Sequence, residues 1–282
     1  MTTASSVLET WIAAHPYLKD VARFEQIVED VLAGADVSPL QCPQWENCTD
    51  GFRAGLPMLS NRALNEAVMG QAEDFLARLV SELQKTDCPD SVRNDCAVLD
   101  EEIRRLPDTA IGIIKQVAEG VPVSLEIPKK FSPGTARFLG WRAIEYAVRP
   151  WRKSLELWIA GESWGHPYCP LCGEKPAMSQ LVRTQKGRER YLSCGCCRTR
   201  WNYVRLSCAF CGNHDQTGME ILEIEKEEDF RIDVCRACNG YIKTYLSEGN
   251  EQLMLSDWST LHLDVIAADQ GLKRSAHSLY EA

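Results

Sequence analysis

The sequence predicts an α+β chain in which an all-helical N-terminal domain precedes two tandem metal-binding modules and a C-terminal helix. Three observations predict this order. Apolar residues recur at helical spacing through residues 1–160. Four Cys-x-x-Cys pairs then fall between residues 169 and 238, two in segment 161–206 and two in segment 207–247. A last helical pattern lies within residues 248–282.

The composition suits a globular protein of the cytoplasm. The 282 residues are enough for one large or two ordinary domains, and a hydrophobic content of 45% supports a core. Residues 1–11 lack a basic segment followed by an apolar run, so we expect no signal peptide. The sequence has no apolar run long enough to span a membrane. We therefore expect a cytoplasmic location, where the 13 cysteines serve metals in preference to disulfides.

Helical periodicity accounts for most of the first 160 residues. We expect a helix close to the N-terminus and a second over residues 19–32. Residues 34–60 are rich in Gly, Pro and Asp and are predicted to form a long connection. Further helices are expected from Asn61 to the break at Pro89, over residues 92–105 and over residues 109–119.

The last helical stretch of this half has the most regular apolar stripe. Its members recur at spacings of 4 and 3, and they are Trp141, Ile144, Val148, Trp151, Leu155 and Trp158. We interpret this stripe as core. Pro150 lies within it, so we expect a kink or a break there. The other side carries basic residues that we expect to form a solvated face, namely Arg142, Arg149, Arg152 and Lys153.

Eight cysteines form the strongest motif of the chain. The gaps between successive Cys-x-x-Cys pairs are 21, 10 and 23 residues, so two long gaps enclose a short one. Each pair presents two thiolates to one ion, and a hairpin of about 20 residues brings a second pair back to the first. The simplest partition is sequential. It assigns Cys169, Cys172, Cys194 and Cys197 to one site, and Cys208, Cys211, Cys235 and Cys238 to the other.

Each module resembles a rubredoxin-like or zinc-ribbon unit. Cys169-Pro170-Leu171-Cys172-Gly173 is a knuckle in which Gly allows positive φ. Short alternating segments predict strands at residues 177–182, 190–193, 201–206, 220–224 and 231–234. The apolar residues of one module are too few for a core, so metal binding is expected to drive its folding. We expect two ions, iron or zinc, because tetrathiolate sites suit both metals.

The remaining cysteines and a histidine are expected to have no role as ligands. Cys42, Cys48, Cys88 and Cys96 have no Cys-x-x-Cys partner, and we interpret them as structural thiols. The two-residue spacing favours Cys194 with Cys197, which leaves Cys196 as a spare thiol beside a metal. A C-terminal helix is expected over residues 257–273, and His262 is a lone histidine on it.

Charge distinguishes the two modules. The net charge of −9 argues against nucleic acid as a main partner. Residues 183–205 carry seven basic residues and one acidic residue, whereas residues 220–229 carry six acidic residues and one lysine. These stretches could contact nucleic acid and a basic peptide, respectively, but we favour solvated hairpins for both.

These residues together resemble one family, the formate dehydrogenase accessory proteins of the FdhE type. The likeness covers nearly the whole chain, although the helical half resembles the family mainly in its layout and in Arg149-Pro150. The matching cysteine motifs are Cys169-Pro170-x-Cys172-Gly173, Tyr191-Leu192-x-Cys194-x-x-Cys197 with Trp201 and Val204-Arg205, Cys208-x-x-Cys211, and Cys235-x-x-Cys238-x-x-Tyr241-Ile242-Lys243. The matching C-terminal residues are Asp257, Thr260, Leu263-Asp264, Ala267 and Gly271 to Arg274.

The resemblance implies a cytoplasmic maturation factor and not a metabolic enzyme. Family members join a helical domain to two rubredoxin-like sites, with iron as the metal type. The implied partner is the catalytic subunit of a formate dehydrogenase, with metal ligation assigned to the eight cysteines. The chain is expected to have no membrane contact, and a homo-oligomer is left open.

Two other function classes remain as alternatives. A thiol-disulfide redox protein would use its Cys-x-x-Cys pairs directly, but none of these pairs lies between a strand and a helix of a βαβ unit. A zinc-ribbon protein could bind nucleic acid, but the acidic balance weakens that reading. Capture of a client enzyme distinguishes the accessory factor from both.

Overall fold

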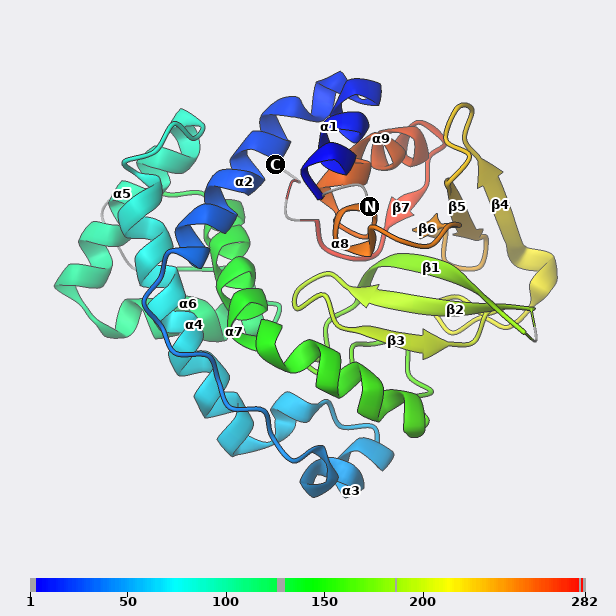
Figure 1. The fold of residues 1–282 in the computed structure, drawn as a ribbon, viewed down its shortest axis with the longest axis horizontal. Coiled ribbons are helices and arrows are strands. Elements are labelled where there is room, and N and C mark those ends of the chain that lie inside the picture. The colour runs from blue at the N-terminus through cyan, green and yellow to red at the C-terminus, as the bar shows by residue number, and fades with distance from the viewer. Residues whose placement is uncertain (1–3, 126–129, 186, 279, 281–282) are drawn as a thin grey trace.

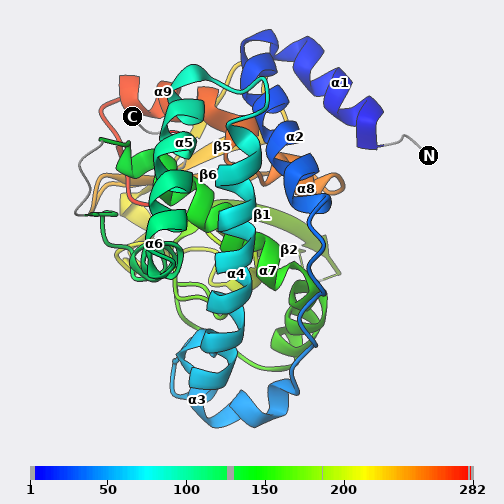
Figure 2. The ribbon, with the colours of Figure 1, turned by 90° about the vertical axis from the view of Figure 1, so that its left-hand side faces the viewer.

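A computed structural model describes residues 4–125, 130–185, 187–278 and 280. Helices fill one side of the molecule and a twisted sheet the other, with helix α7 (Pro133–Gly161) between them (Figure 1). Seen from the helical side, α4 to α6 lie in front of the sheet (Figure 2). The predicted α+β fold is therefore confirmed. Within the described residues, no helix combines the length and apolar character needed to cross a lipid bilayer.

The helices of the N-terminal half begin and end close to the predicted positions. Asn61 caps one helix, since its side chain accepts hydrogen bonds from the backbone N–H groups of Ala63 and Leu64. The helices before α7 are α1 (Ala4–Ala14), α2 (Lys19–Ala33), α3 (Thr49–Arg53), α4 (Arg62–Leu83), α5 (Asp90–Arg105) and α6 (Asp108–Ala118). Short 3-10 helices occur at Pro16–Leu18, Trp45–Cys48 and Met58–Ser60.

The segment predicted as a long connection contains helical turns of its own. Helix α3 and two of the 3-10 helices lie within residues 34–60. Trp45 and Phe52 are 4% and 2% exposed, so this segment buries aromatic rings against the helical core. Composition alone was misleading here, because Gly and Pro at the ends of short helices give the same signal as an irregular loop.

Helix α7 is continuous through Pro150, so a break at this residue is wrong, although the helix changes direction along its length (Figure 1). The apolar stripe is core as predicted, with Trp141, Val148, Trp151 and Leu155 between 0% and 2% exposed. Packing on both sides of the proline stabilises the helix where an isolated peptide would bend or break.

The basic side of α7 is only in part the solvated face that the sequence suggested, because Lys153 is exposed but Arg142 is buried. Arg142 is 3% exposed and lies among carboxylates of α2 and α7. Its guanidinium is 2.9 Å from Glu145 and 3.3 Å from Glu29. Burial raises the pKa of Glu145, but Arg142 and neighbouring arginines outweigh burial and hold that pKa well below its usual value. Helix α2 covers this face, and periodicity within α7 could not reveal that cover.

Both cysteine modules contribute strands to one sheet. The strands are β1 (Pro176–Thr184), β2 (Gly187–Cys194), β3 (Arg200–Tyr203), β4 (Met219–Glu223), β5 (Phe230–Cys235), β6 (Gly240–Tyr245) and β7 (Lys273–Arg274). Their order is β3-β2-β1-β6-β5-β4, and β7 also pairs with β6. Each module forms an antiparallel hairpin, and the parallel pairing of β1 with β6 joins the modules, with Met178 opposite Lys243.

Strand β6, at the centre of this sheet, was not predicted from the sequence. Every residue of β6 is buried, so it lacks the apolar–polar alternation that marks a half-exposed strand. Lys243 also places a charged residue within the sequence of this strand. Its ammonium is nevertheless 2.7 Å from Asp257 and 2.8 Å from Asp264, which satisfies a buried charge.

The C-terminal helix is shorter than predicted. Instead of one helix over residues 257–273, the chain forms α8 (Glu251–Met254), a 3-10 helix at Trp258–Thr260 and α9 (Leu261–Asp269). The residues after α9 extend into β7. Arg274 of β7 contacts Asp257 at 2.7 Å and Asp264 at 2.6 Å, so ion pairs join this end of the chain to the sheet.

Candidate metal centres

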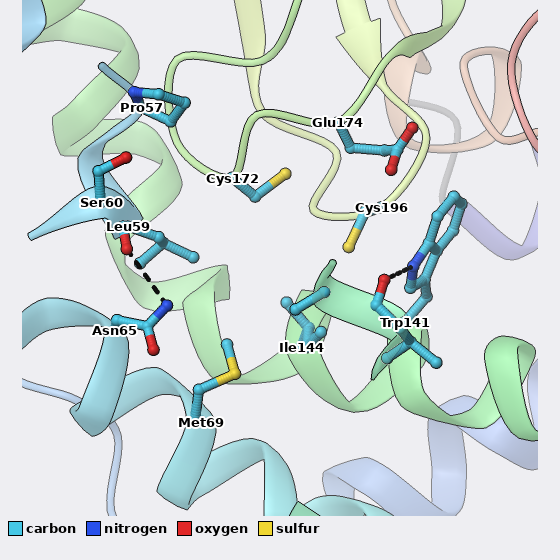
Figure 3. A pocket seen from close by; sticks show the side chains of 12 residues that line it. Pro57, Leu59, Ser60, Asn65, Met69, Trp141, Ile144, Cys172, Glu174 and Cys196 are labelled. Atoms are coloured by element: carbon cyan, nitrogen blue, oxygen red, sulfur yellow. Dashed lines mark hydrogen bonds between the residues drawn. The ribbon is translucent and has the colours of Figure 1, made fainter. Parts of the chain in front are cut away.

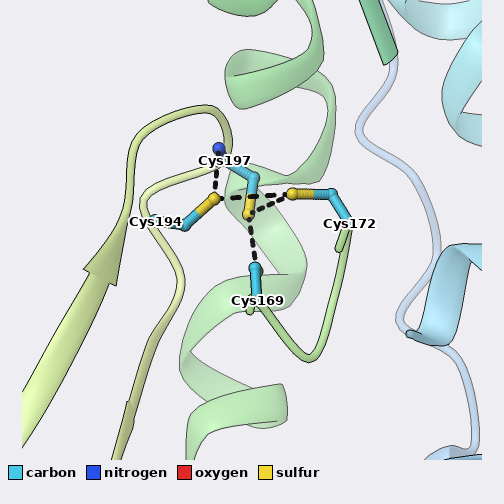
Figure 4. Close-up of side chains that lie close together, drawn as sticks. All are labelled: Cys169, Cys172, Cys194 and Cys197. Carbon is cyan, nitrogen blue, oxygen red and sulfur yellow. Dashed lines mark hydrogen bonds between the residues drawn. The ribbon is translucent and has the colours of Figure 1, made fainter. Parts of the chain in front are cut away.

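The first centre is formed at one end of the β1–β2 hairpin. The structure brings together the sulfur atoms of Cys169, Cys172, Cys194 and Cys197 (Figure 4). Sulfur separations are 3.5 Å for Cys169 and Cys197, 3.4 Å for Cys172 and Cys194, and 3.5 Å for Cys172 and Cys197. The grouping is the sequential one that the spacing predicts.

Backbone conformation explains how each turn presents its thiols. The residue after the second cysteine of every pair has positive φ, at 82° for Gly173, 59° for Arg198, 70° for Gly212 and 55° for Asn239. Within the turns, N–H groups point at the sulfur of the first cysteine, as in the 3.4 Å hydrogen bonds from Leu171 to Cys169 and from Cys197 to Cys194. Arg198 adopts positive φ without being Gly or Asn, and its guanidinium donates a 3.2 Å hydrogen bond to Ser256 Oγ.

The second centre has the same construction in the other hairpin. Sulfur atoms of Cys208, Cys211, Cys235 and Cys238 converge, with 3.8 Å between Cys208 and Cys238 and 3.7 Å between Cys211 and Cys235. Burial raises the pKa of Cys235, but N–H groups of Cys238 and Ala237 lower it to about 7. These hydrogen bonds favour the thiolate form that a metal ion needs.

Both sulfur sets fit a tetrahedral ion. Zinc–sulfur bonds of about 2.3 Å place the sulfur atoms roughly 3.8 Å apart. The second centre matches this separation, and the first is a few tenths of an ångström tighter. Each centre can therefore hold one metal ion, and four thiolates would complete its coordination. The geometry suits zinc and iron alike.

The two centres differ in their exposure to solvent. Cys169 and Cys197 are both 0% exposed, whereas Cys211 of the second centre is exposed. The helical half covers the first centre directly, because N–H groups of Met58 and Leu59 donate to the carbonyls of Pro170 and Leu171 at 2.8 and 2.9 Å. The first centre therefore lies at the junction of helices and sheet.

This difference predicts two phases of metal release. With an excess of a water-soluble chelator, the second centre is expected to lose its ion at least about tenfold faster, because attack on its thiolates needs no separation of helices from sheet. Chelator absorbance and elemental analysis would follow release from a protein holding two tetrathiolate ions per chain. Cys211→Ser should remove the fast phase and leave the slow one. A single phase, or a fast phase retained in this variant, would contradict the assignment.

Cys196 lies beside the first centre without joining its ligand set. It is 6% exposed and faces a cavity of about 120 Å³ that Cys172, Glu174, Met69 and Trp141 also line (Figure 3). Its own N–H donates to Cys194 Sγ at 3.4 Å. The structure therefore places Cys196 next to the first metal centre as a buried thiol outside the ligand set. The sequence predicts a spare thiol beside a metal at this position.

The helical-half cysteines lie outside the ligand clusters found in the described part of the chain. Cys88 and Cys96 are buried, and Cys88 donates a 3.3 Å hydrogen bond to the carbonyl of Leu83. Burial raises the pKa of Cys96 to about 12. Cys42 is exposed and lies 2.8 Å from Ser154 Oγ, and Cys48 is partly exposed.

The basic hairpin is partly buried, contrary to the solvated hairpin that we favoured. Arg190 is 2% exposed and donates hydrogen bonds to Ser207 O at 2.8 Å and to Ser179 Oγ at 3.1 Å. Arg200 of β3 contacts Gln180 of β1, across the intervening strand β2. These guanidinium groups bind within the sheet, so fewer of them are free for a nucleic-acid backbone.

The structure also forms a cluster that the sequence did not indicate, from His15, Glu227 and His262. His262 was predicted to be a lone histidine, and Glu227 to lie on a solvated tip. Their side chains are instead 12% and 13% exposed, and they contact each other. The residues are too far apart in the sequence for any ligand spacing to have indicated the cluster.

Comparison with known proteins shows which family these features resemble. Residues 168–205 match the family model described as FdhE, central domain. The chain is 36% identical over 152 residues to a protein FdhE homolog of Stutzerimonas stutzeri, covering 52% of this chain and 48% of the relative. It is 34% identical over 113 residues to a protein FdhE homolog of Aquifex aeolicus, covering 39% and 40%, respectively. These matches thus span about half or less of each relative.

A solved structure extends the likeness in fold. The crystal structure of the FdhE protein from Pseudomonas aeruginosa superposes with a TM-score of 0.61, over 95% of this chain and 89% of the other. Sequence identity in that superposition is 22%, so it shows a shared fold. The resemblance to the FdhE family that the cysteine motifs indicated is confirmed.

Proposed function

We propose that the chain is a formate dehydrogenase accessory factor, because residues 168–205 match the FdhE central-domain model and the chain shares the fold of an FdhE crystal structure. In this role it binds the catalytic subunit of a formate dehydrogenase in the cytoplasm and supports activation or assembly of that enzyme. The observation that carries the proposal is the family match over residues 168–205, which contain the whole first metal centre.

The chemistry of the two tetrathiolate centres supports a binding role over catalysis. Four cysteines around one ion leave no coordination position for formate or water. The parallel pairing of β1 with β6 joins both centres in one sheet, and α7 packs against that sheet through β3. A rigid surface of this kind suits the holding of a partner protein. We accordingly propose that the chain does not itself oxidise formate.

Deletion of this protein from its host tests the proposal. Formate oxidation is expected to fall at least about tenfold, and intact chain should restore it while co-purifying with the catalytic subunit. A variant with Cys169→Ser and Cys172→Ser should restore neither activity nor capture. Cys88→Ser is the matched control, since this cysteine lies outside both centres and should support full activity.

Two results would refute the proposal. One is normal formate oxidation in the deletion strain when no redundant homologue is present. The other is formate oxidation by the purified chain alone, which would make it an enzyme.

A further inference from the structure

Three side chains from distant segments meet at the junction of the N-terminal helices, the second module and the C-terminal helix. His15 follows α1, Glu227 lies in the turn between β4 and β5, and His262 is in the first turn of α9. Glu227 Oε1 lies 2.6 Å from His15 Nε2 and 3.1 Å from His262 Nε2. All three side chains are 8–13% exposed, so the cluster is largely shielded from water.

The orientation of His15 is compatible with ligation of a cation. Its Nδ1 lies 2.9 Å from the carbonyl oxygen of Trp11, which can only accept a hydrogen bond. Nδ1 therefore carries a proton. Nε2 lies 2.6 Å from Glu227 Oε1, where it donates to the carboxylate when protonated and is available to a cation when it is not. A backbone carbonyl that holds the other ring nitrogen is a common support for metal-ligating histidines.

His262 supplies an independent observation. Both of its ring nitrogens are buried, and neither forms a hydrogen bond of acceptable geometry with the described residues. Burial lowers the pKa of His262 and the nearby His15 lowers it further, against the opposing effect of Glu227. His262 Nε2 faces the carboxylate oxygen of Glu227 that His15 also approaches. Buried imidazole nitrogens without partners are uncommon unless something else binds them.

We propose that His15 Nε2, His262 Nε2 and the Glu227 carboxylate bind one divalent cation of the zinc class. Two imidazoles and one carboxylate are donors that zinc prefers, and its +2 charge exceeds the single negative charge of Glu227. Bonds of about 2.0–2.1 Å in tetrahedral geometry place donors roughly 3.3 Å apart. Two of the three donor separations, at 2.6 and 3.1 Å, lie within about 1 Å of this value, and all three donor atoms lie within 4.8 Å of one another.

Such an ion would connect three parts of the chain that the thiolate centres do not connect. Aromatic rings surround the cluster, with ring centroids 3.9 Å apart for Trp11 and His15 and 5.8 Å apart for Tyr17 and His262. Trp11 also donates a 3.1 Å hydrogen bond to Ser259 O, just before α9. Three protein ligands leave a fourth coordination position, which water would fill.

Metal counting on the intact chain tests this site. Protein with both thiolate centres filled is dialysed against a small excess of Zn²⁺, and total metal per chain is measured. We expect three ions per chain in the wild type and two in His262→Phe, which keeps an aromatic ring but removes both nitrogens. His277→Ala should still bind three, because His277 is exposed and outside the cluster.

A second readout separates ion binding from general damage. Added Zn²⁺ should raise the melting temperature of the wild type and of His277→Ala by several degrees, and leave that of His262→Phe unchanged. Retention of two thiolate-bound ions shows that His262→Phe is folded. Saturation of the wild type at two ions, or three ions in His262→Phe, would overturn the proposal.

Discussion

Replacement of Cys169 by serine is expected to empty the first metal centre and unfold the β1–β2 hairpin around it. Cys169 is 0% exposed, and its sulfur lies 3.5 Å from that of Cys197. A structural tetrathiolate site contributes about 10–16 kcal/mol, which is comparable with the whole stability of about 5–15 kcal/mol of a domain. A serine hydroxyl is a poor ligand for such an ion, so most of this free energy is lost. The equivalent Cys238→Ser should have the same effect on the second hairpin.

Limited proteolysis with elemental analysis would measure this result. We expect new cleavage within residues 187–203 for Cys169→Ser and within residues 219–235 for Cys238→Ser, with one ion lost in each case. Cys88→Ser is the control, since its hydroxyl can keep the hydrogen bond to the carbonyl of Leu83. Because β1 pairs with β6, some loosening of the neighbouring hairpin is expected in both variants. Equal resistance of all three variants to protease would contradict a folding role for the metal.

Arg142→Ala is expected to destabilise the helical half by roughly 3–5 kcal/mol, the range for removing one partner of a buried ion pair. Arg142 is 3% exposed, and the substitution deprives two carboxylates of a counter-charge, Glu145 at 1% and Glu25 at 6% exposed. Arg149 and Arg152 still contact Glu145, which keeps the loss toward the lower end. For a unit of this size the melting temperature should fall by about 6–20 °C.

The matched control is Arg62→Ala, which breaks an exposed pair with Glu66 and should cost less than about 1 kcal/mol. Urea unfolding at several pH values tests the cause. Ion pairs lower the pKa of Glu145 in the folded protein, so its ionised carboxylate stabilises the fold at pH values above its pKa in the unfolded chain, about 4.3. This stabilisation is lost as the pH falls through the lower pKa of the folded protein. The difference between wild type and Arg142→Ala should therefore shrink between pH 5 and roughly pH 3. An unchanged difference over that interval would point to lost packing as the cause.

The sequence by itself determined the features that depend on near neighbours. Two cysteines three positions apart share one turn, so the 21-10-23 spacing was enough to group eight sulfur atoms into two sets. The helical stripe from Trp141 to Leu155 predicted a buried face, because side chains three and four positions apart lie on the same side of a helix. Asn61 marked a helix start for a similarly local reason, since its side chain reaches only the next N–H groups.

Only the tertiary structure decided which elements cover one another. Periodicity shows that one face of α7 is apolar, but the carboxylates of α2 that bury Arg142 lie more than 100 positions away. Strand β6 lacked alternation because neighbours bury both of its faces, and the structure alone shows that Lys243 meets Asp257 and Asp264 there. His15 and Glu227 are 212 positions apart, so no spacing rule could bring them together. The free energy of a buried polar group depends on partners from other segments, and those partners exist only once the chain has folded.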